Sequence, residues 1–160
     1  MSEPIVRPER RRRQARLMRL VNIPMRIVLT LPFATPLSGA LMLVTLTGRK
    51  TGKTYRQPVS YVPDGDTLLT PGGGKWKANL REGQPVRLRL RGRNVIARPE
   101  LVKDVVEVER LLHRMAASNP RVTSFVPVIG ANGHIDRGKL EAAVNAGFRI
   151  VRWHLDTARP

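Results

Sequence analysis

The chain has 160 residues, a length typical of one domain with a single sizeable core. It contains no cysteine, which excludes disulfides, thiolate metal ligands, iron–sulfur clusters and a cysteine nucleophile. The net charge of +17 predicts attraction to anionic partners, whether nucleic acid, anionic lipid or an acidic small molecule, and does not choose among them. The three histidines, His113, His134 and His154, lack any ligand spacing, so we expect no metal site.

The first 30 residues carry eight arginines against two glutamates. Leu17, Leu20 and Val21 recur at helical spacing, and this predicts a basic amphipathic helix from residue 8 to residue 23, which Pro24 ends. Two alternatives remain open. The helix lies on an anionic membrane, with contact through residues 8–26, or it packs on the rest of the protein. We therefore divide the chain into an N-terminal segment, 1–30, and a main domain, 31–160.

Residues 27–47 form a charge-free stretch of 21 residues, which is long enough to span a bilayer. Pro32, Pro36 and Gly39 interrupt it, and its second half is typical of a buried strand. No small-residue cleavage site follows a continuous apolar region, so a signal peptide is not expected. These features predict a cytoplasmic protein, and peripheral contact at the inner face of the plasma membrane follows only under the alternative in which the N-terminal helix lies on the membrane.

The stretch Leu41 to Gly65 predicts two strands joined by the basic turn Gly48-Arg-Lys-Thr-Gly52. The flanking glycines allow a close backbone approach, and Arg49, Lys50 and Lys53 supply positive charge. That combination suits a phosphate or a polycarboxylate. A solvated basic turn is the alternative that these residues alone leave open.

A second block reads Thr70-Pro-Gly-Gly-Gly-Lys-Trp-Lys-Ala-Asn-Leu80. It has a run of glycines, a basic residue and then the pattern Trp-x-x-Asn-Leu. The two blocks, in this order and at this spacing, resemble the deazaflavin-dependent nitroreductase family, and the resemblance covers residues 40–155. It implies a split β-barrel oxidoreductase that uses coenzyme F420, an 8-hydroxy-5-deazaflavin.

Alternation of apolar and polar residues and the turn signals predict strands at 40–47, 54–62, 66–70, 85–91, 93–98 and 148–155. A long helix is predicted from Glu100 to Ser118, and a short one from Asp136, as N-cap, to Ala146. The expected fold class is mainly β (α+β): a split β-barrel with an N-terminal amphipathic helix and one long plus one short packing helix.

The resemblance also implies which residues bind the coenzyme. Its phosphate and its oligoglutamate tail would contact Arg49 and Lys50, the backbone of Thr51 and Gly52, and, more weakly, Arg56 and Lys53. The second block would pass along the deazaflavin and the phosphodiester linker through Pro71, Gly72, Gly73, Gly74 and Lys75. Trp76 either walls the ring pocket or fills the core, and Asn79 either touches the ligand or caps a turn.

The chain departs from the family pattern in ways that affect the substrate. Pro71 stands where a lysine often precedes the glycine pair, and the family's tyrosine on the second strand is replaced by Ser60, with Tyr61 beside it. The C-terminal tyrosines that gather over the substrate are absent, which argues against nitroimidazole activation of the best-known sort. Thr70, Ser60 and Tyr61 are the candidates for orienting a substrate.

The leading hypothesis is a deazaflavin-dependent oxidoreductase that transfers hydride between the reduced coenzyme and an apolar acceptor, such as a quinone, an enone or a nitro compound. An FMN-binding split-barrel protein is one alternative. A non-catalytic basic module for nucleic acid or anionic membrane is another. Since aromatic residues make up only 4% of the chain, specific nucleic-acid binding is not expected. A homodimer remains open, because split barrels often pair.

Overall fold

The computed structural model describes residues 41–72, 75–120, 126, 128–129 and 133–156. The predicted N-terminal helix, the segment 1–30 and the glycines Gly73 and Gly74 lie outside the described residues. In chain order the elements are β1 (Leu41–Thr47), β2 (Thr54–Ser60), β3 (Val62–Asp64), β4 (Thr67–Gly72), the 3-10 helix η2 (Lys75–Asn79), β5 (Val86–Leu90), β6 (Arg93–Val102), α2 (Val105–Ser118), α4 (Arg137–Asn145) and β7 (Arg149–Leu155).

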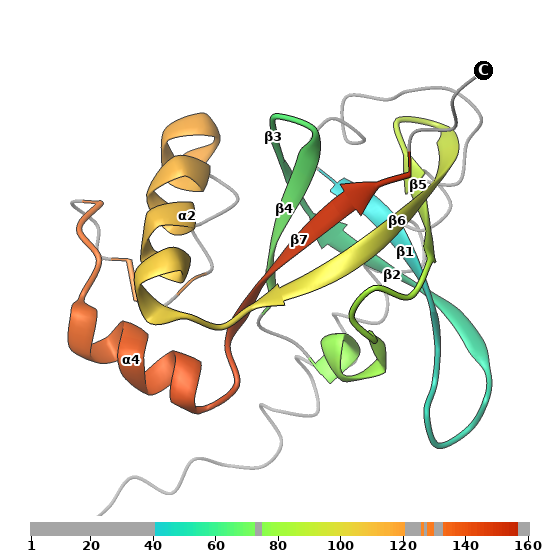
Figure 1. Cartoon of the computed structure of the whole chain (residues 1–160), viewed down its shortest axis with the longest axis horizontal. Helices are drawn as coiled ribbons and strands as arrows, with labels where there is room; N and C mark the ends of the chain where they lie inside the picture. The colour runs from blue at the N-terminus through green and yellow to red at the C-terminus, as the bar shows by residue number, and fades with distance from the viewer. Residues whose placement is uncertain (1–40, 73–74, 121–125, 127, 130–132, 157–160) are drawn as a thin grey trace, which may run out of the picture.

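The strands form one antiparallel sheet in the order β2-β1-β5-β6-β7-β4-β3. Helices α2 and α4 lie together beside the strongly twisted sheet (Figure 1). The short helix η2 lies between the tip of the β1–β2 hairpin and the turn from α4 into β7 (Figure 1). The predicted fold class, a mainly β split barrel with a long and a short packing helix, is confirmed for the described residues.

The sheet separates two apolar clusters, and successive residues of a strand point to opposite ones. Leu68 and Val151 belong to the cluster inside the barrel, around the fully buried Trp153. Their neighbours Leu69 and Ile150 belong to the cluster beneath α2 and α4. This alternation fixes the register of the central strands, because a slip of one residue would exchange the two faces.

The predicted start of the long helix at Glu100 is wrong. The segment from Pro99 to Val102 continues β6 and pairs with β7, and α2 begins at Val105. Asp104 is the N-cap, and its side chain accepts a hydrogen bond from the backbone N–H of Glu107 at 2.9 Å. The end of the helix at Ser118 and the Asp136 cap of α4 are as predicted.

The predicted strand 54–62 is also wrong in part, because it divides at Tyr61. Strand β2 ends at Ser60 and pairs with β1, whereas β3 starts at Val62 and pairs with β4. Tyr61 lies between them with 2% of its surface exposed. The chain therefore passes from one edge of the sheet to the other at this residue.

Ion pairs join α2 to the strand beside it. Arg152 of β7 donates to Glu107 of α2 at 2.8 Å and to Glu100 of β6 at 3.1 Å. Arg110 donates to the same Glu107 carboxylate. The hydrogen bonds from Arg110 and Arg152 outweigh desolvation and lower the pKa of Glu107 to about 2.

Candidate functional site

The hairpin tip, residues 48–53, uses most of its backbone donors within the protein. The N–H of Gly48 donates to the carbonyl of Lys53, and the N–H of Gly52 donates to the carbonyl of Gly48, both at 2.9 Å. Gly52 has a φ of +66°, which favours glycine. The backbone N–H groups of Lys50 and Thr51 have no acceptor among the described residues, so they can donate to a bound anion.

Asn79, at the end of η2, holds the tip in place. Its side-chain oxygen accepts from the backbone N–H of Arg49 at 3.1 Å, and its side-chain nitrogen donates to the hydroxyl of Tyr55 at 2.7 Å. Both hydrogen-bonding ends of the amide are thus used to fix the hairpin against η2. These hydrogen bonds are those of a cap, and because Asn79 also lines the pocket beside the tip, its contact with a ligand stays a prediction.

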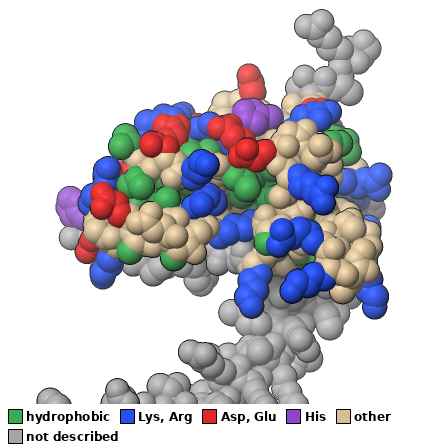
Figure 2. Space-filling model, turned by 60° about the horizontal axis from the view of Figure 1, so that its bottom comes forward, with side chains coloured by type: hydrophobic (Ala, Val, Ile, Leu, Met, Phe, Trp, Pro, Cys, Tyr) green, Lys and Arg blue, Asp and Glu red, His purple; other side chains and the backbone are tan. Residues whose placement is uncertain are grey.

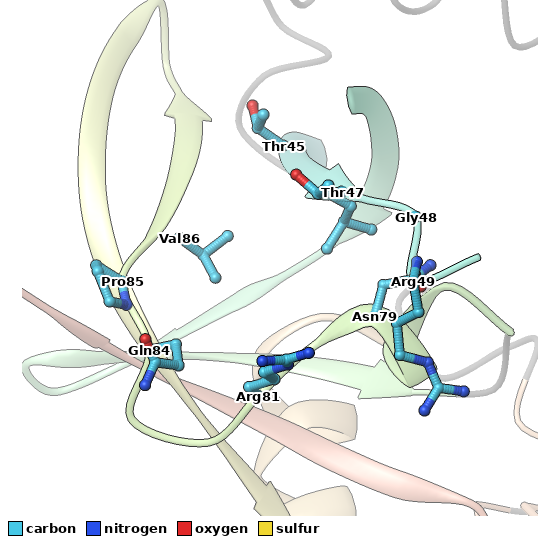
Figure 3. Close-up of a pocket in the computed structure, with 10 residues that line it drawn as sticks. Thr45, Thr47, Gly48, Arg49, Asn79, Arg81, Gln84, Pro85 and Val86 are labelled. Carbon is cyan, nitrogen blue, oxygen red and sulfur yellow. Dashed lines mark hydrogen bonds between the residues drawn. The ribbon is translucent and has the colours of Figure 1, made fainter. Parts of the chain in front are cut away.

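A pocket of about 390 Å³ lies beside the tip, and we call it the hairpin pocket. Its lining residues are Thr45, Leu46, Thr47, Gly48, Arg49, Asn79, Arg81, Gln84, Pro85 and Val86. Figure 3 shows the β1 threonines on one side, Gln84, Pro85 and Val86 opposite them, and Arg49 next to Asn79 at one end. The pocket therefore combines guanidinium groups, hydroxyls and an apolar wall, and its volume is within the usual range for small-molecule sites.

The electrostatics of this region favour an anion. Arg49, Lys50, Lys53 and Arg81 are exposed, and none of them pairs with a carboxylate among the described residues. Figure 2 shows basic side chains gathered over the lower right of the displayed face, with no acidic side chain among them. An anion bound there would gain charge-assisted hydrogen bonds without displacing an internal partner.

The structure brings only part of the predicted coenzyme site together. Arg49 and Asn79 line the hairpin pocket, and Lys50, Thr51 and Gly52 are on the adjoining tip. Arg56 is exposed on β2, on the same hairpin. The other predicted residues described by the structure, Pro71, Gly72, Lys75 and Trp76, do not line this pocket.

Trp76 is half-buried and stacks on Trp153, with ring centroids 6.5 Å apart and planes inclined by 10°. Both rings belong to the cluster inside the barrel. This contact is that of a residue packed against the core, and a role in walling the ring pocket stays a prediction. Lys75 lines a second pocket, together with Lys77 and Arg149.

The candidates for orienting a substrate do not line the hairpin pocket. Thr70 is 1% exposed, and its hydroxyl accepts a hydrogen bond from the indole N–H of Trp153 at 3.0 Å. The hydroxyl of the buried Tyr61 accepts from Arg91 at 3.3 Å. Ser60 pairs with Leu41, at the end of the hairpin opposite the tip. Their substrate role stays a prediction.

Several residues of the hairpin pocket were not foreseen from the sequence. Arg81 and Gln84 follow the Trp-x-x-Asn-Leu pattern closely, so the position of Arg81 directly after Leu80 was a signal that could have suggested it. Thr45 and Thr47 alternate along β1 with the inward-facing Leu46. Alternation places both threonines on the face that the pocket uses.

Within the part of the chain that the structure describes, no helix is both long enough and apolar enough to cross a membrane.

Several solved structures are similar to this one at low sequence identity. One, described as a domain-swapped dimer, is 12% identical with a TM-score of 0.51, and the match covers 85% of this chain and 98% of the other. A proposed pyridoxamine 5′-phosphate oxidase from Listeria innocua is 12% identical with a TM-score of 0.46, covering 74% of this chain and 85% of that protein. A proposed 5-nitroimidazole antibiotic resistance protein from Bacteroides thetaiotaomicron is 14% identical with a TM-score of 0.46, covering 76% of each chain.

No curated protein matches the chain. The model of the F420H(2)-dependent quinone reductase family matches residues 12–127, which is most of the sequence and includes both blocks. The resemblance drawn from those two blocks is thereby confirmed. The chain belongs to the F420H(2)-dependent quinone reductase family, and it is an oxidoreductase built on a split β-barrel.

Proposed function

We propose that this protein binds coenzyme F420 at the hairpin pocket and uses its reduced form to reduce an apolar acceptor, with a quinone as the first candidate. The observation that carries the proposal is the basic tip, fixed by Asn79 next to a pocket that holds Arg49 and Arg81. Family membership supports the coenzyme and the substrate class.

The groups in the pocket fit the chemistry of such a coenzyme. Its phosphate and its glutamate carboxylates would meet the side chains of Arg49 and Arg81 and the backbone N–H groups of Lys50 and Thr51. Arginine suits these anions because its planar fork can donate two parallel hydrogen bonds. The apolar wall, which includes Val86, can pack against an uncharged part of the ligand.

When bound, the reduced deazaflavin supplies a hydride, and a quinone that accepts this hydride and one proton becomes a hydroquinone. The chain's own part is to bind, to orient and to exclude water. The described residues show neither a nucleophile–base pair nor a group of three candidate metal ligands. Rate enhancement would come from holding the two reactants at a reactive distance.

Contact of residues 8–26 with an anionic membrane, assembly into a homodimer and a cytoplasmic location stay predictions. An apolar quinone substrate is consistent with membrane contact, because apolar compounds partition into lipid.

The test is the oxidation of reduced F420 by a soluble quinone, such as menadione, in the presence of purified protein. We expect turnover that depends on the protein and on the quinone, with little or none when reduced FMN or NADPH replaces reduced F420. An enone and a nitroaromatic compound define the acceptor range. Turnover with FMN in place of F420 would overturn the coenzyme assignment. Tight F420 binding without reduction of any acceptor would overturn the assignment as a reductase.

A further inference from the structure

A second pocket, which we call the η2–β7 pocket, lies on the side of η2 nearest the turn from α4 into β7. Its volume is about 440 Å³. Its lining residues are Lys75, Lys77, Ala78, Leu101, Ala146, Gly147 and Arg149. None of these lines the hairpin pocket, so the two pockets are separate. Figure 1 shows η2 between the tip of the β1–β2 hairpin, beside one pocket, and the turn from α4 into β7, beside the other.

Three of the residues that line the η2–β7 pocket are basic, and no lining residue is acidic. Among the described residues, Lys75, Lys77 and Arg149 form no salt bridge. By contrast, Arg152, three positions beyond Arg149, pairs with two glutamates. The pocket thus concentrates positive charge that the described part of the protein does not neutralise.

The fold holds two of these cations in place. Lys77 is half-buried, and its Nζ donates to the carbonyl oxygen of Gly72 at 2.6 Å. The Nη1 atom of Arg149 donates to the carbonyls of Val144 at 2.9 Å and Phe148 at 2.7 Å. An ammonium group has three donors, so the bond to Gly72 leaves Lys77 with donors for a ligand.

Close packing between β4 and β7 builds this arrangement. Gly72 pairs with Arg149 across the two strands. A Cβ atom at Gly72 would lie 2.9 Å from the Arg149 carbonyl oxygen and 3.4 Å from Cδ of Lys77. A glycine at this position therefore lets the lysine stem cross the strand end and bring its charge toward Arg149.

The environment of Lys77 disfavours its charged form. Burial lowers the pKa of Lys77, and the positive charge of Arg149 lowers it further. A bound anion would reverse the second effect, because it would lie near both cations and screen their repulsion.

We propose that Lys75, Lys77 and Arg149 form a second anion-binding subsite, which takes the phosphate or carboxylate group of a small molecule. The concave shape and the small side chains of Ala78 and Ala146, with Gly147, leave room for a compact anionic group. The proposal does not depend on F420 binding at the hairpin pocket, because the two sites have no residue in common.

The test is a titration of the full-length protein with inorganic phosphate at constant ionic strength. Backbone ¹H–¹⁵N NMR spectra recorded at each phosphate concentration monitor the binding. Citrate in a parallel arm distinguishes carboxylates from phosphate. Residue-resolved shifts are needed because a protein of charge +17 attracts anions over its whole surface. We expect saturable shifts at Ala78 and Gly147 and only weak, linear shifts around Lys139, which lines neither pocket.

Two variants separate charge from shape. Lys77→Gln removes the charge and keeps a donor, and the loss of one charge-assisted hydrogen bond should weaken binding about tenfold. Ala146→Leu keeps all three cations and fills space, so it should also weaken binding. Lys139→Gln is the control, because Lys139 is exposed on α4 and does not line the pocket.

Saturation at Ala78 and Gly147 that both pocket variants weaken, and the control does not, would support the subsite. Linear shifts at the pocket that are no larger than those around Lys139 would overturn it, since they would mark diffuse attraction. If a variant does not fold, this comparison of sites in the unmodified protein still decides the question. F420 binding at the hairpin pocket is measured separately, by fluorescence titration and by variants of Arg49 and Arg81, which do not line this pocket.

Discussion

Asn79 and Arg49 join the two sequence blocks into one site, because the Asn79 side chain accepts the hydrogen bond of the Arg49 backbone N–H at 3.1 Å. The two residues are far apart in sequence, and their contact fixes the basic tip of the β1–β2 hairpin against η2. The pocket beside the tip therefore has a defined shape before any ligand arrives, which reduces the cost of ordering it on binding.

Replacing Asn79 by alanine should weaken coenzyme binding and destabilise the fold. The backbone N–H of Arg49 and the hydroxyl of Tyr55 would each lose a partner. We expect a loss of about 1–2 kcal/mol in the free energy of unfolding, measured by urea denaturation. The control is Asn145→Ala, an exposed position in α4, which should change stability by less than about 0.5 kcal/mol. Unchanged coenzyme affinity in Asn79→Ala would show that the cap does not organise the pocket.

Thr70→Val should destabilise the protein more than Thr70→Ser. Valine has nearly the same shape as threonine but leaves the buried indole N–H of Trp153 without its acceptor. Thr70→Val should lower the free energy of unfolding by about 1–3 kcal/mol. Thr70→Ser should retain most of the stability, because serine keeps the hydroxyl. If Thr70 has only this structural role, Thr70→Val should have the same kcat as the unmodified protein when both are assayed well below the Tm of the variant. A large fall in kcat with unchanged stability would instead establish the predicted substrate role.

The Glu107 carboxylate should make stability depend on pH in acid. Its pKa is lowered from 4.5 in the unfolded chain to about 2 in the folded protein, first by hydrogen bonding to Arg110. A lowered pKa contributes stability that is fully present above pH 4.5 and is lost as the pH falls toward 2. Glu107→Gln should therefore flatten the fall of the unfolding free energy over this window, as followed by urea denaturation.

Asp66→Asn serves as the comparison for Glu107, because Asp66 is an exposed carboxylate in the turn before β4. A slope that changes as much in Asp66→Asn as in Glu107→Gln would show that the effect is not specific to Glu107. Equal slopes in the unmodified protein and in Glu107→Gln would contradict the assignment.

Gly72→Ala and Gly138→Ala should have opposite effects on stability. A methyl group at Gly72 would lie 2.9 Å from a backbone oxygen of Arg149, so the strands would have to shift, at a cost of about 1–3 kcal/mol. At Gly138, on the exposed surface of α4, an added Cβ atom would lie 3.5 Å from Oδ1 of Asp136, which is ordinary contact, and alanine should stabilise the helix by about 0.5–1 kcal/mol. Thermal unfolding measures both. A neutral Gly72→Ala would show that β4 and β7 do not need this close approach.

The sequence allowed the hairpin, most strands and the Asp136 cap of α4 to be predicted, because each depends on local signals. The β5–β6 turn is an example. Arg91 and Gly92 have φ values of +47° and +76°, and a glycine in a two-residue turn between alternating strands indicates such a hairpin.

The start of α2 could not be predicted this way, because proline before an apolar run suggests a helix start. In the fold, the N–H of Leu101 points to Glu82, away from β7. Pro99, two residues earlier, faces the same open edge, where its missing N–H breaks no pairing with β7. Tertiary pairing therefore outweighs the local signal. The meeting of Lys77 and Arg149 was equally hidden, since it depends on the register of β4 on β7.

The central claim is that the hairpin pocket binds the anionic deazaflavin coenzyme, and a fluorescence titration with oxidised F420 at physiological salt tests it most directly. The account predicts saturable binding tighter than that of FMN, weakened about tenfold or more by Arg49→Gln and by Arg81→Gln, and unchanged by Arg93→Gln, an exposed arginine at the start of β6. F420 binding that is equal in all three variants, or the absence of saturable binding, would contradict it.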